Sequence, residues 1–211
     1  MNEREASWPA VHSLATVRWV DPPHPATLEV DVLTNQCRMS QFKRGGPGGQ
    51  HRNKTQTAIR WVHEPTGVEA QSNEFREQVR NRSVALRRLR IQLAIDLRTR
   101  WDGSPEPLDN RQPIDVSTGS PELIVPQGLD RLQGPSAPQG LRVSPDHTAY
   151  PAVLAQLLDD LYRSGGQPSL IKSKWGGSSS GIIQFLSDLP TALAEVNRWR
   201  AHLGIKPLRP T

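Results

Sequence analysis

Alternation of apolar and polar residues predicts a small sheet in the first third of the chain. Residues 26–33 and 37–43 alternate in this way, which is typical of half-buried β-strands. Residues 56–63 and 67–72 form two more apolar stretches on either side of Glu64-Pro65-Thr66. Proline and glycine at this spacing favour a tight turn. The pattern therefore predicts two strands followed by a β-hairpin.

One long amphipathic helix is predicted after the hairpin, over residues 74–99, with Asn73 placed to cap its N-terminus. Apolar side chains recur at steps of three, four or seven and form a single stripe, which should pack on the sheet. The stripe consists of Phe75, Val79, Leu86, Leu89, Leu93 and Leu97. The arginines on the other faces are expected to point outward: Arg76, Arg80, Arg82, Arg87, Arg88 and Arg90.

The rest of the chain is expected to be irregular, extended or helical in turn. Residues 1–25 hold four prolines and no sustained period, and residues 101–150 are rich in proline, which indicates an extended linker. Helical spacing of apolar residues returns at 150–162 and at 190–203. The segment 172–181 between them is interpreted as a flexible loop and not a phosphate cradle, because it lacks the Gly-Lys-Ser/Thr ending of a nucleotide-binding loop.

Together these elements predict an α+β fold. A small mixed or antiparallel sheet packs on one long basic helix, and a proline-rich linker leads to a small C-terminal helical region. The expected domain limits are an irregular segment at 1–25, a first domain at 26–100, the linker at 101–150 and the helical region at 151–211.

Positive charge concentrates in the part that carries the predicted sheet and helix. The 211 residues have a net charge of +5, but residues 38–100 hold fourteen Lys and Arg against five acidic residues. The flanking segments, 1–37 and 101–211, are both slightly acidic. A cationic face of this density suits a polyanion, because Lys and Arg contact phosphates without regard to sequence. A solvated surface remains the alternative for any single arginine.

Several classes of protein are excluded by composition. The single cysteine, Cys37, rules out an internal disulfide framework and favours a reducing compartment. No apolar run is long enough to span a membrane, and the first residues lack a basic start followed by an apolar core. The histidines show no metal-ligand spacing. We therefore expect a cytoplasmic protein without a metal ion.

The most constrained stretch is Arg44-Gly45-Gly46-Pro47-Gly48-Gly49-Gln50-His51-Arg52-Asn53-Lys54. Its glycines lack a Cβ and accept positive φ, so backbone N–H groups can approach a ligand closely. A second Gly-Gly-Gln, Gly165-Gly166-Gln167, lacks the following His-x-Asn-Lys. We interpret it as a helix C-terminus, with Gly165 or Gly166 in the left-handed conformation and Pro168 beyond it. The bare tripeptide is therefore weak evidence of function.

Three further motifs follow the first Gly-Gly-Gln in order: Thr57-Ala58-Ile59-Arg60, then His63-x-Pro65-Thr66-Gly67, then Arg76-x-Gln78-x-x-Asn81-Arg82. Together, from about Cys37 to about Arg98, they resemble the catalytic domain of bacterial class I peptide chain release factors. They resemble equally the codon-independent ribosome-rescue relatives of these factors. The resemblance covers roughly a third of the chain.

The resemblance implies hydrolysis of the peptidyl-tRNA ester in the peptidyl-transferase centre of the large ribosomal subunit. The backbone N–H of Gln50 would stabilise the oxyanion that forms when water attacks, with Gly48 and Gly49 setting its torsions. The side chain of Gln50 would line the water site. Pro47, His51 and Asn53 would support the loop, and His51 is not expected to act as a general base.

The resemblance also implies partners. These are the 23S-type rRNA and the peptidyl-tRNA of the ribosome, with the chain a monomer away from it. No cofactor is expected, but N5-methylation of Gln50 by a dedicated methyltransferase is raised by the resemblance. The residues expected to contact RNA are Lys43, Arg44, Arg52, Lys54, Arg80, Arg82, Arg87 and Arg88.

Two departures from the family pattern shape the functional hypothesis. Codon-reading release factors have a long helical N-terminal domain and a domain with a codon-reading tripeptide, whereas only about 36 residues precede Cys37 here. Rescue factors end in a short basic tail, whereas residues 101–211 are close to neutral and partly helical. We therefore expect a codon-independent rescue hydrolase. The alternative is a ribosome- or RNA-binding module of the same fold with weak or partner-dependent hydrolysis.

Overall fold

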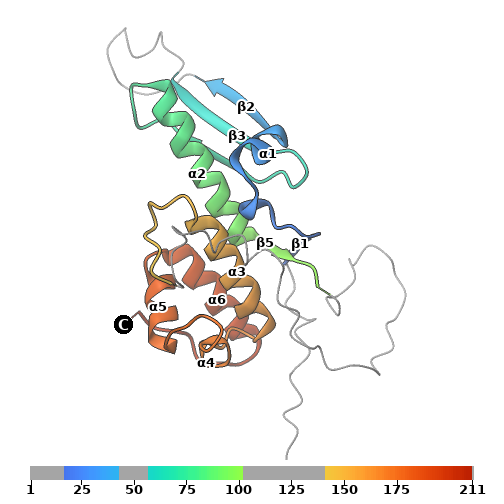
Figure 1. Cartoon of the computed structure of the whole chain (residues 1–211), viewed down its shortest axis with the longest axis vertical. Coiled ribbons are helices and arrows are strands. Elements are labelled where there is room, and N and C mark those ends of the chain that lie inside the picture. The colour runs from blue at the N-terminus through green and yellow to red at the C-terminus, as the bar shows by residue number, and fades with distance from the viewer. Residues whose placement is uncertain (1–16, 43–56, 102–140, 211) are drawn as a thin grey trace, which may run out of the picture. The chain divides into compact units, whose positions relative to one another are not determined.

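The computed structural model describes residues 17–42, 57–101 and 141–210, coloured in Figure 1. These residues belong to two compact units. The first, which we call the sheet unit, comprises Pro23–Leu97 and Val143–Leu158. The second, the helical unit, takes its described residues from Met1–Pro22, Arg98–Arg142 and Asp159–Thr211. Helices and strands in both units confirm the predicted α+β class.

The sheet unit contains the predicted sheet, which is antiparallel with strand order β2-β3-β4. Its strands are β2 (Cys37–Phe42), β3 (Ala58–His63) and β4 (Glu69–Ser72). Gly67 has a φ of 68° in the turn between β3 and β4, a conformation that glycine adopts without strain. The predicted second strand and the hairpin are therefore confirmed.

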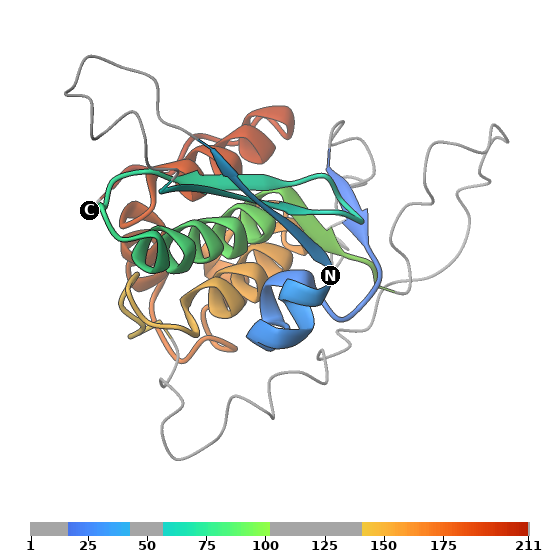
Figure 2. The ribbon, with the colours of Figure 1, turned by 90° about the horizontal axis from the view of Figure 1, so that it is seen from above.

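Helix α2 (Gln78–Asp96) packs along β3 and β4, and Figure 2 shows it lying along one face of the sheet. Its buried residues include Ala85, Leu89 and Leu93, which recur every fourth position and face the strands. The predicted stripe is confirmed at Leu89 and Leu93. It is wrong at Val79, whose exposed fraction is 77%, because Val79 is the second residue of the helix and lies to one side of this row.

The predicted start of this helix is also wrong. The helix begins at Gln78 with Glu77 in the N-cap position, and no side chain caps it. The chain before it, including Asn73 and Phe75, is not helical. The reason is Asn81, the fourth residue of α2. Its buried side chain bonds to both the backbone N–H and the backbone C=O of Phe75, which keeps Phe75 out of the helix.

The strand predicted at residues 26–33 is wrong. The structure has a 3-10 turn η2 (Pro25–Thr27) followed by the short helix α1 (Val30–Asn35). His24 stabilises the turn locally, since its Nδ1 accepts a hydrogen bond from the Ala26 N–H at 3.0 Å. Leu33 is buried completely. Local capping, the burial of Ala26 and Leu33, and hydrogen bonds from Arg90 of α2 to the Ala26 and Leu28 carbonyls hold this segment without a partner strand.

The helical unit contains four helices among its described residues. They are the end of α3 (Tyr150–Arg163), then α4 (Pro168–Ile171), α5 (Ser179–Ser187) and α6 (Pro190–His202). Helices α3 and α6 confirm the two predicted from apolar spacing. A short strand β1 (Arg18–Val20) lies in the segment that was expected to be irregular, and it pairs with β5 (Leu97–Thr99).

The segment expected to be a flexible loop, 172–181, has turns and the first residues of α5 instead. Trp175 is buried, and its Nε1 donates a hydrogen bond to Asp160 Oδ2 at 3.0 Å. Lys174 pairs with the same carboxylate at 2.7 Å. Ser178 then caps α5 by accepting a hydrogen bond from the Gly181 N–H. Apolar burial of one tryptophan explains why this glycine- and serine-rich segment takes a defined path.

The second Gly-Gly-Gln is a helix terminus, as predicted. Gly165 and Gly166 have φ of 62° and 72°, and the N–H of Gly166 bonds to the Leu161 carbonyl at 2.6 Å. This is the hydrogen-bonding pattern of a glycine-terminated helix. A Cβ at Gly166 would lie only 2.7 Å from Arg200 Cγ. These glycines therefore serve the end of α3.

Candidate functional site

The glycine-rich stretch lies between two strand ends that are paired with each other. Strand β2 ends at Phe42, strand β3 begins at Ala58, and these two residues are partners in the antiparallel register. Residues 43–56 lie outside the described residues. Ten predicted site residues fall there, namely Lys43, Arg44, Pro47, Gly48, Gly49, Gln50, His51, Arg52, Asn53 and Lys54. The structure thus describes the residues on either side of this stretch. We call Phe42, Thr57 and Ala58 the stem.

The stem residue Thr57 is held by Asn81, a fully buried side chain in the first turns of α2. Asn81 Nδ2 donates to the Thr57 carbonyl at 2.7 Å and to the Phe75 carbonyl at 2.9 Å. Its Oδ1 accepts from Ser72 Oγ at 3.1 Å and from the Phe75 N–H at 3.0 Å. A primary amide has two donor hydrogens and two acceptor lone pairs, so its capacity is fully used.

The orientation of this amide follows from its partners. Exchange of its oxygen and nitrogen would set the oxygen against two carbonyl oxygens and the NH2 group against an N–H. Asn81 was part of a quoted motif but was not among the predicted site residues. Its partners Thr57 and Phe75 lie 24 and 6 positions away, so helical periodicity gives no signal for this network.

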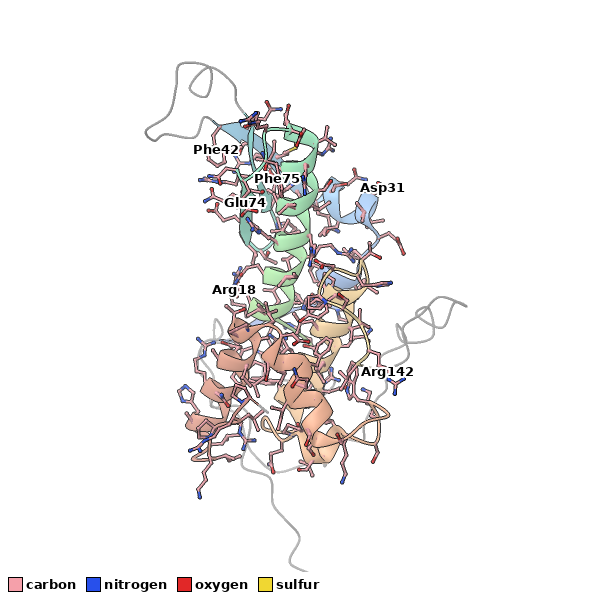
Figure 3. All side chains as sticks on the ribbon, turned by 90° about the vertical axis from the view of Figure 1, so that its left-hand side faces the viewer. Arg18, Asp31, Phe42, Glu74, Phe75 and Arg142 are labelled. Carbon is pink, nitrogen blue, oxygen red and sulfur yellow. The ribbon has the colours of Figure 1, made fainter. Side chains whose placement is uncertain are left out.

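Two of the predicted RNA-contacting arginines, Arg80 and Arg82, are exposed on the first turns of α2. The guanidinium of Arg80 lies 3.7 Å from the ring centroid of Phe75, and that of Arg82 lies 5.6 Å from Trp61. Figure 3 shows Phe75 and Phe42 at the same end of the sheet unit. Stacking on a ring orders a guanidinium but leaves its N–H groups available to an anion.

The other two, Arg87 and Arg88, bind within the sheet unit. Arg87 Nη2 pairs with Asp146 Oδ1 at 2.7 Å and also donates to the Pro145 carbonyl. Arg88 Nη2 pairs with Glu74 Oε1 at 2.6 Å, and its Nη1 donates to the Gln71 carbonyl. RNA contact by these two residues stays a prediction, but each already has acidic and carbonyl partners.

His63, the first residue of one of the sequence motifs, has a structural role here. His63 is buried, with Nδ1 2.7 Å from Thr66 Oγ1 and Nε2 3.1 Å from Gln36 Oε1. The contacts suit a neutral ring that donates from Nε2 to the glutamine oxygen. Burial lowers the pKa of His63 below its ordinary value. The ring joins the β3–β4 turn to the residue before β2.

Other chemistry at the described residues is limited. Burial, with a smaller contribution from the negative charge of Glu64, raises the pKa of Cys37 to about 11, so its thiol is a poor nucleophile at neutral pH. Within the described ranges no group of three or more His, Cys, Asp and Glu is arranged to hold a metal ion. No helix in these ranges is long and apolar enough to cross a bilayer.

The part of the chain that carries the stem matches a known protein family. Residues 26–117 match the family model described as the RF-1 domain. This span covers the described strands β2, β3 and β4, helix α2 and the glycine-rich stretch between β2 and β3. Residues 26–117 are therefore similar to a domain of the peptide chain release factors.

Individual relatives agree with this assignment. The chain is 42% identical to the mitochondrial peptide chain release factor 1 of Bos taurus over 71 residues, 34% of this chain and 16% of the relative. It is 42% identical to peptide chain release factor 1 of Ureaplasma parvum over 84 residues, 39% of this chain and 21% of the relative. It is 32% identical to peptide chain release factor 2 of a Caulobacter species over 108 residues, 51% and 29% respectively. The match spans less than a third of the length of each relative.

Proposed function

We propose that this chain hydrolyses the ester bond of peptidyl-tRNA on the ribosome without reading a codon, and so ends translation on stalled ribosomes. The observation that carries the proposal is the position of Gly48-Gly49-Gln50. In this chain the tripeptide belongs to a span that matches the RF-1 domain, and in the sequence it lies between the paired strands β2 and β3. The stem beside it is held by the buried amide of Asn81. Similarity to peptide chain release factors supports the wider assignment to translation termination.

The chemistry requires little from the protein beyond position and one donor. Attack of water on the ester builds negative charge on the carbonyl oxygen. A fixed backbone N–H, here that of Gln50, stabilises that charge, and a positioned water molecule avoids much of the entropic cost of a bimolecular reaction. Glycines before the donor let the backbone approach the ester without a clashing Cβ. The described residues contribute the stem from which this segment leaves the sheet.

Binding to RNA is supported by the charge of the sheet unit. Arg76, Arg80 and Arg82 are exposed beside the stem, and within the described ranges none of them forms an ion pair. Phosphate contacts by such arginines are strong at low salt and weaken as salt rises, because binding releases counterions from the nucleic acid. The 23S-type rRNA and the tRNA acceptor end are the polyanions that this function provides.

The experiment below tests separately whether release requires a codon in the A site. We also expect the chain to act as a monomer in the cytoplasm, without a cofactor. N5-methylation of Gln50 by a dedicated methyltransferase remains an expectation from the resemblance.

The test is release of a labelled peptide from purified ribosomes. The A site of these ribosomes holds no codon, a sense codon or a stop codon. Gly49→Ala should lower the release rate about 100-fold, because it displaces the oxyanion donor, while ribosome binding persists. Gly177→Ala is the matched control. Its φ is not in the left-handed region, and an added Cβ would lie 3.7 Å from its nearest neighbouring atom, so it should release like the wild type.

The outcomes separate the parts of the proposal. Release with an empty A site that is lost in Gly49→Ala supports codon-independent hydrolysis. Release only at a stop codon contradicts the codon-independent part. A wild type that binds ribosomes but releases no peptide contradicts hydrolysis and favours the RNA-binding module.

A further inference from the structure

Asn81 joins three parts of the sheet unit at the end where the glycine-rich stretch begins and ends. Its side chain bonds to Ser72 at the end of β4, to Phe75 before α2 and to Thr57 before β3. The bond to the Thr57 carbonyl is the shortest of the four, at 2.7 Å. Thr57 is the first described residue after the stretch that holds Gly48-Gly49-Gln50.

Thr57 lies next to the last described pair of the β2–β3 register. That pair consists of Phe42 and Ala58. Side chains in a helix point toward its N-terminus, so Asn81, one turn into α2, is directed back to the stem. Its amide thus ties Thr57 directly to α2.

The neighbours of Asn81 connect the stem to the basic face of α2. Arg80 and Arg82 flank it in sequence and are exposed. The backbone carbonyl of Arg82 also accepts a hydrogen bond from Trp61 Nε1 in β3 at 3.3 Å. One turn of α2 therefore carries both the bond to the stem and the arginines expected to meet RNA.

We propose that Asn81 is a positioning residue for peptide release, because it holds Thr57, the first described residue after the glycine-rich stretch, in place relative to Arg80 and Arg82 of α2. This inference rests on the proposed function. When Arg80 and Arg82 are bound to RNA, the Asn81 bond to Thr57 holds the start of β3 at a set place relative to them. The chain that follows the glycine-rich stretch therefore starts from a fixed point beside these arginines.

The obvious variant is Asn81→Ala, which removes all four bonds. Asn81→Ser is the second variant in case the first does not fold. Its hydroxyl keeps a neutral polar group in the buried site but ends one bond short of the nitrogen that reaches the Thr57 carbonyl. Ser72→Ala is the matched control, since it removes one bond of the same buried amide and leaves the bond to Thr57 in place.

Peptide release is measured in single turnover as a function of protein concentration, beside the thermal unfolding of each variant. We expect the Asn81 variants to lose 10- to 100-fold in the rate at saturation, with the half-saturating concentration changed less than about threefold. Ser72→Ala should be less stable than the wild type but release at the same saturated rate. If Asn81 is purely structural, both Asn81 variants, when folded, will release peptide at the wild-type saturated rate. This result would overturn the proposal.

A second measurement separates this proposal from the proposed function. Hydrogen exchange of the free protein is followed in the peptide that covers residues 57–63. If the wild type releases no peptide, the proposed function fails, but faster exchange of Ala58 and Ile59 in the Asn81 variants than in Ser72→Ala still upholds the link to the stem. Equal exchange in all of these variants overturns that link.

Discussion

At the scale of the residue, His63 shows how burial and hydrogen bonding set the response to pH. Its ring lies between Thr66 and Gln36, and burial lowers its pKa below the ordinary value of 6.5. Between these two pKa values the unfolded chain binds more protons than the folded chain. The stability that neutral His63 contributes is therefore complete above about pH 6.5 and is lost as the pH falls through the lowered pKa.

We expect the free energy of unfolding of the wild type to fall between about pH 7.5 and about pH 5.5. His63→Gln should be less stable by about 1–2 kcal/mol at neutral pH, because two part-buried hydrogen bonds are disturbed, and should lose part of this pH dependence. Urea unfolding followed by circular dichroism at both pH values measures it. His202→Gln, at an exposed histidine of α6, is the control for the loss of an imidazole and should be about as stable as the wild type at neutral pH. An unchanged pH dependence in His63→Gln contradicts the interpretation.

Residues with near neighbours as partners were predictable, and those with distant partners were not. Gly165 and Gly166 were recognised as a helix terminus because the hydrogen bonds of such a terminus span only five or six residues. Asn81 was missed as a functional residue because its four bonds depend on where β3, β4 and α2 meet. The candidate catalytic residues came from a motif, and residues 43–56 lie outside the described part of the chain.

At the scale of the element, α2 divides its arginines between two tasks. Arg80 and Arg82 are exposed near the stem and stack on aromatic rings. Arg87 and Arg88 bind acidic side chains and backbone carbonyls, and Arg90 donates to the carbonyls of Ala26 and Leu28. A basic helix is therefore not uniformly available to RNA, and the first turns of α2 are the best candidates for contact.

We expect Arg80→Gln and Arg82→Gln each to weaken ribosome binding and to reduce the slope of log affinity against log salt by about 0.7–0.9, the value for one phosphate contact. Arg88→Gln is the matched control, and it should change the slope much less because its guanidinium already pairs with Glu74. Binding measured over a range of potassium concentrations checks this. A larger change of slope for Arg88→Gln than for Arg80→Gln would reverse the assignment.

Elements were predicted well where periodicity and burial agree. Strand β3 and helices α3 and α6 follow their apolar patterns, since each buries the face that its sequence marks as apolar. The alternation at residues 26–33 misled because it is short, and Val30 and Val32 are 44% and 48% exposed in α1. Pattern alone cannot tell a buried valine from one that lies on a small exposed helix.

At the scale of the whole molecule, the sheet unit is built from two distant parts of the chain. Residues 143–158 belong to it together with Pro23–Leu97. They supply the Pro145 carbonyl and the Asp146 carboxylate to Arg87, and the Thr148 carbonyl to Arg90. They also bury several large apolar side chains completely or nearly so, namely Val143, Tyr150, Val153, Leu154, Leu157 and Leu158.

A chain cut after Arg100 should therefore unfold at a clearly lower temperature than the full chain, or fail to fold. Each buried side chain of this kind contributes about 2 kcal/mol, so the loss of several is large compared with typical stability. Thermal unfolding followed by far-ultraviolet circular dichroism measures the difference.

Asp146→Asn is the control for this truncation. It removes a single ion pair whose carboxylate side chain is 86% exposed, so it should cost less than about 1 kcal/mol. A truncated chain that melts like the full chain would show that residues 143–158 add little to the sheet unit.

The placement of the tryptophans determines which part of the protein intrinsic fluorescence monitors. In the helical unit, Trp19 lies 5.2 Å from Trp101 between ring centroids, and Tyr162 lies 5.2 Å from Trp199. Of the five described tryptophans, Trp61 alone belongs to the sheet unit. Intrinsic fluorescence therefore follows mainly the helical unit, and unfolding of the release-factor domain alone changes it little. Emission and circular dichroism have to be compared before any melt is read as a single transition.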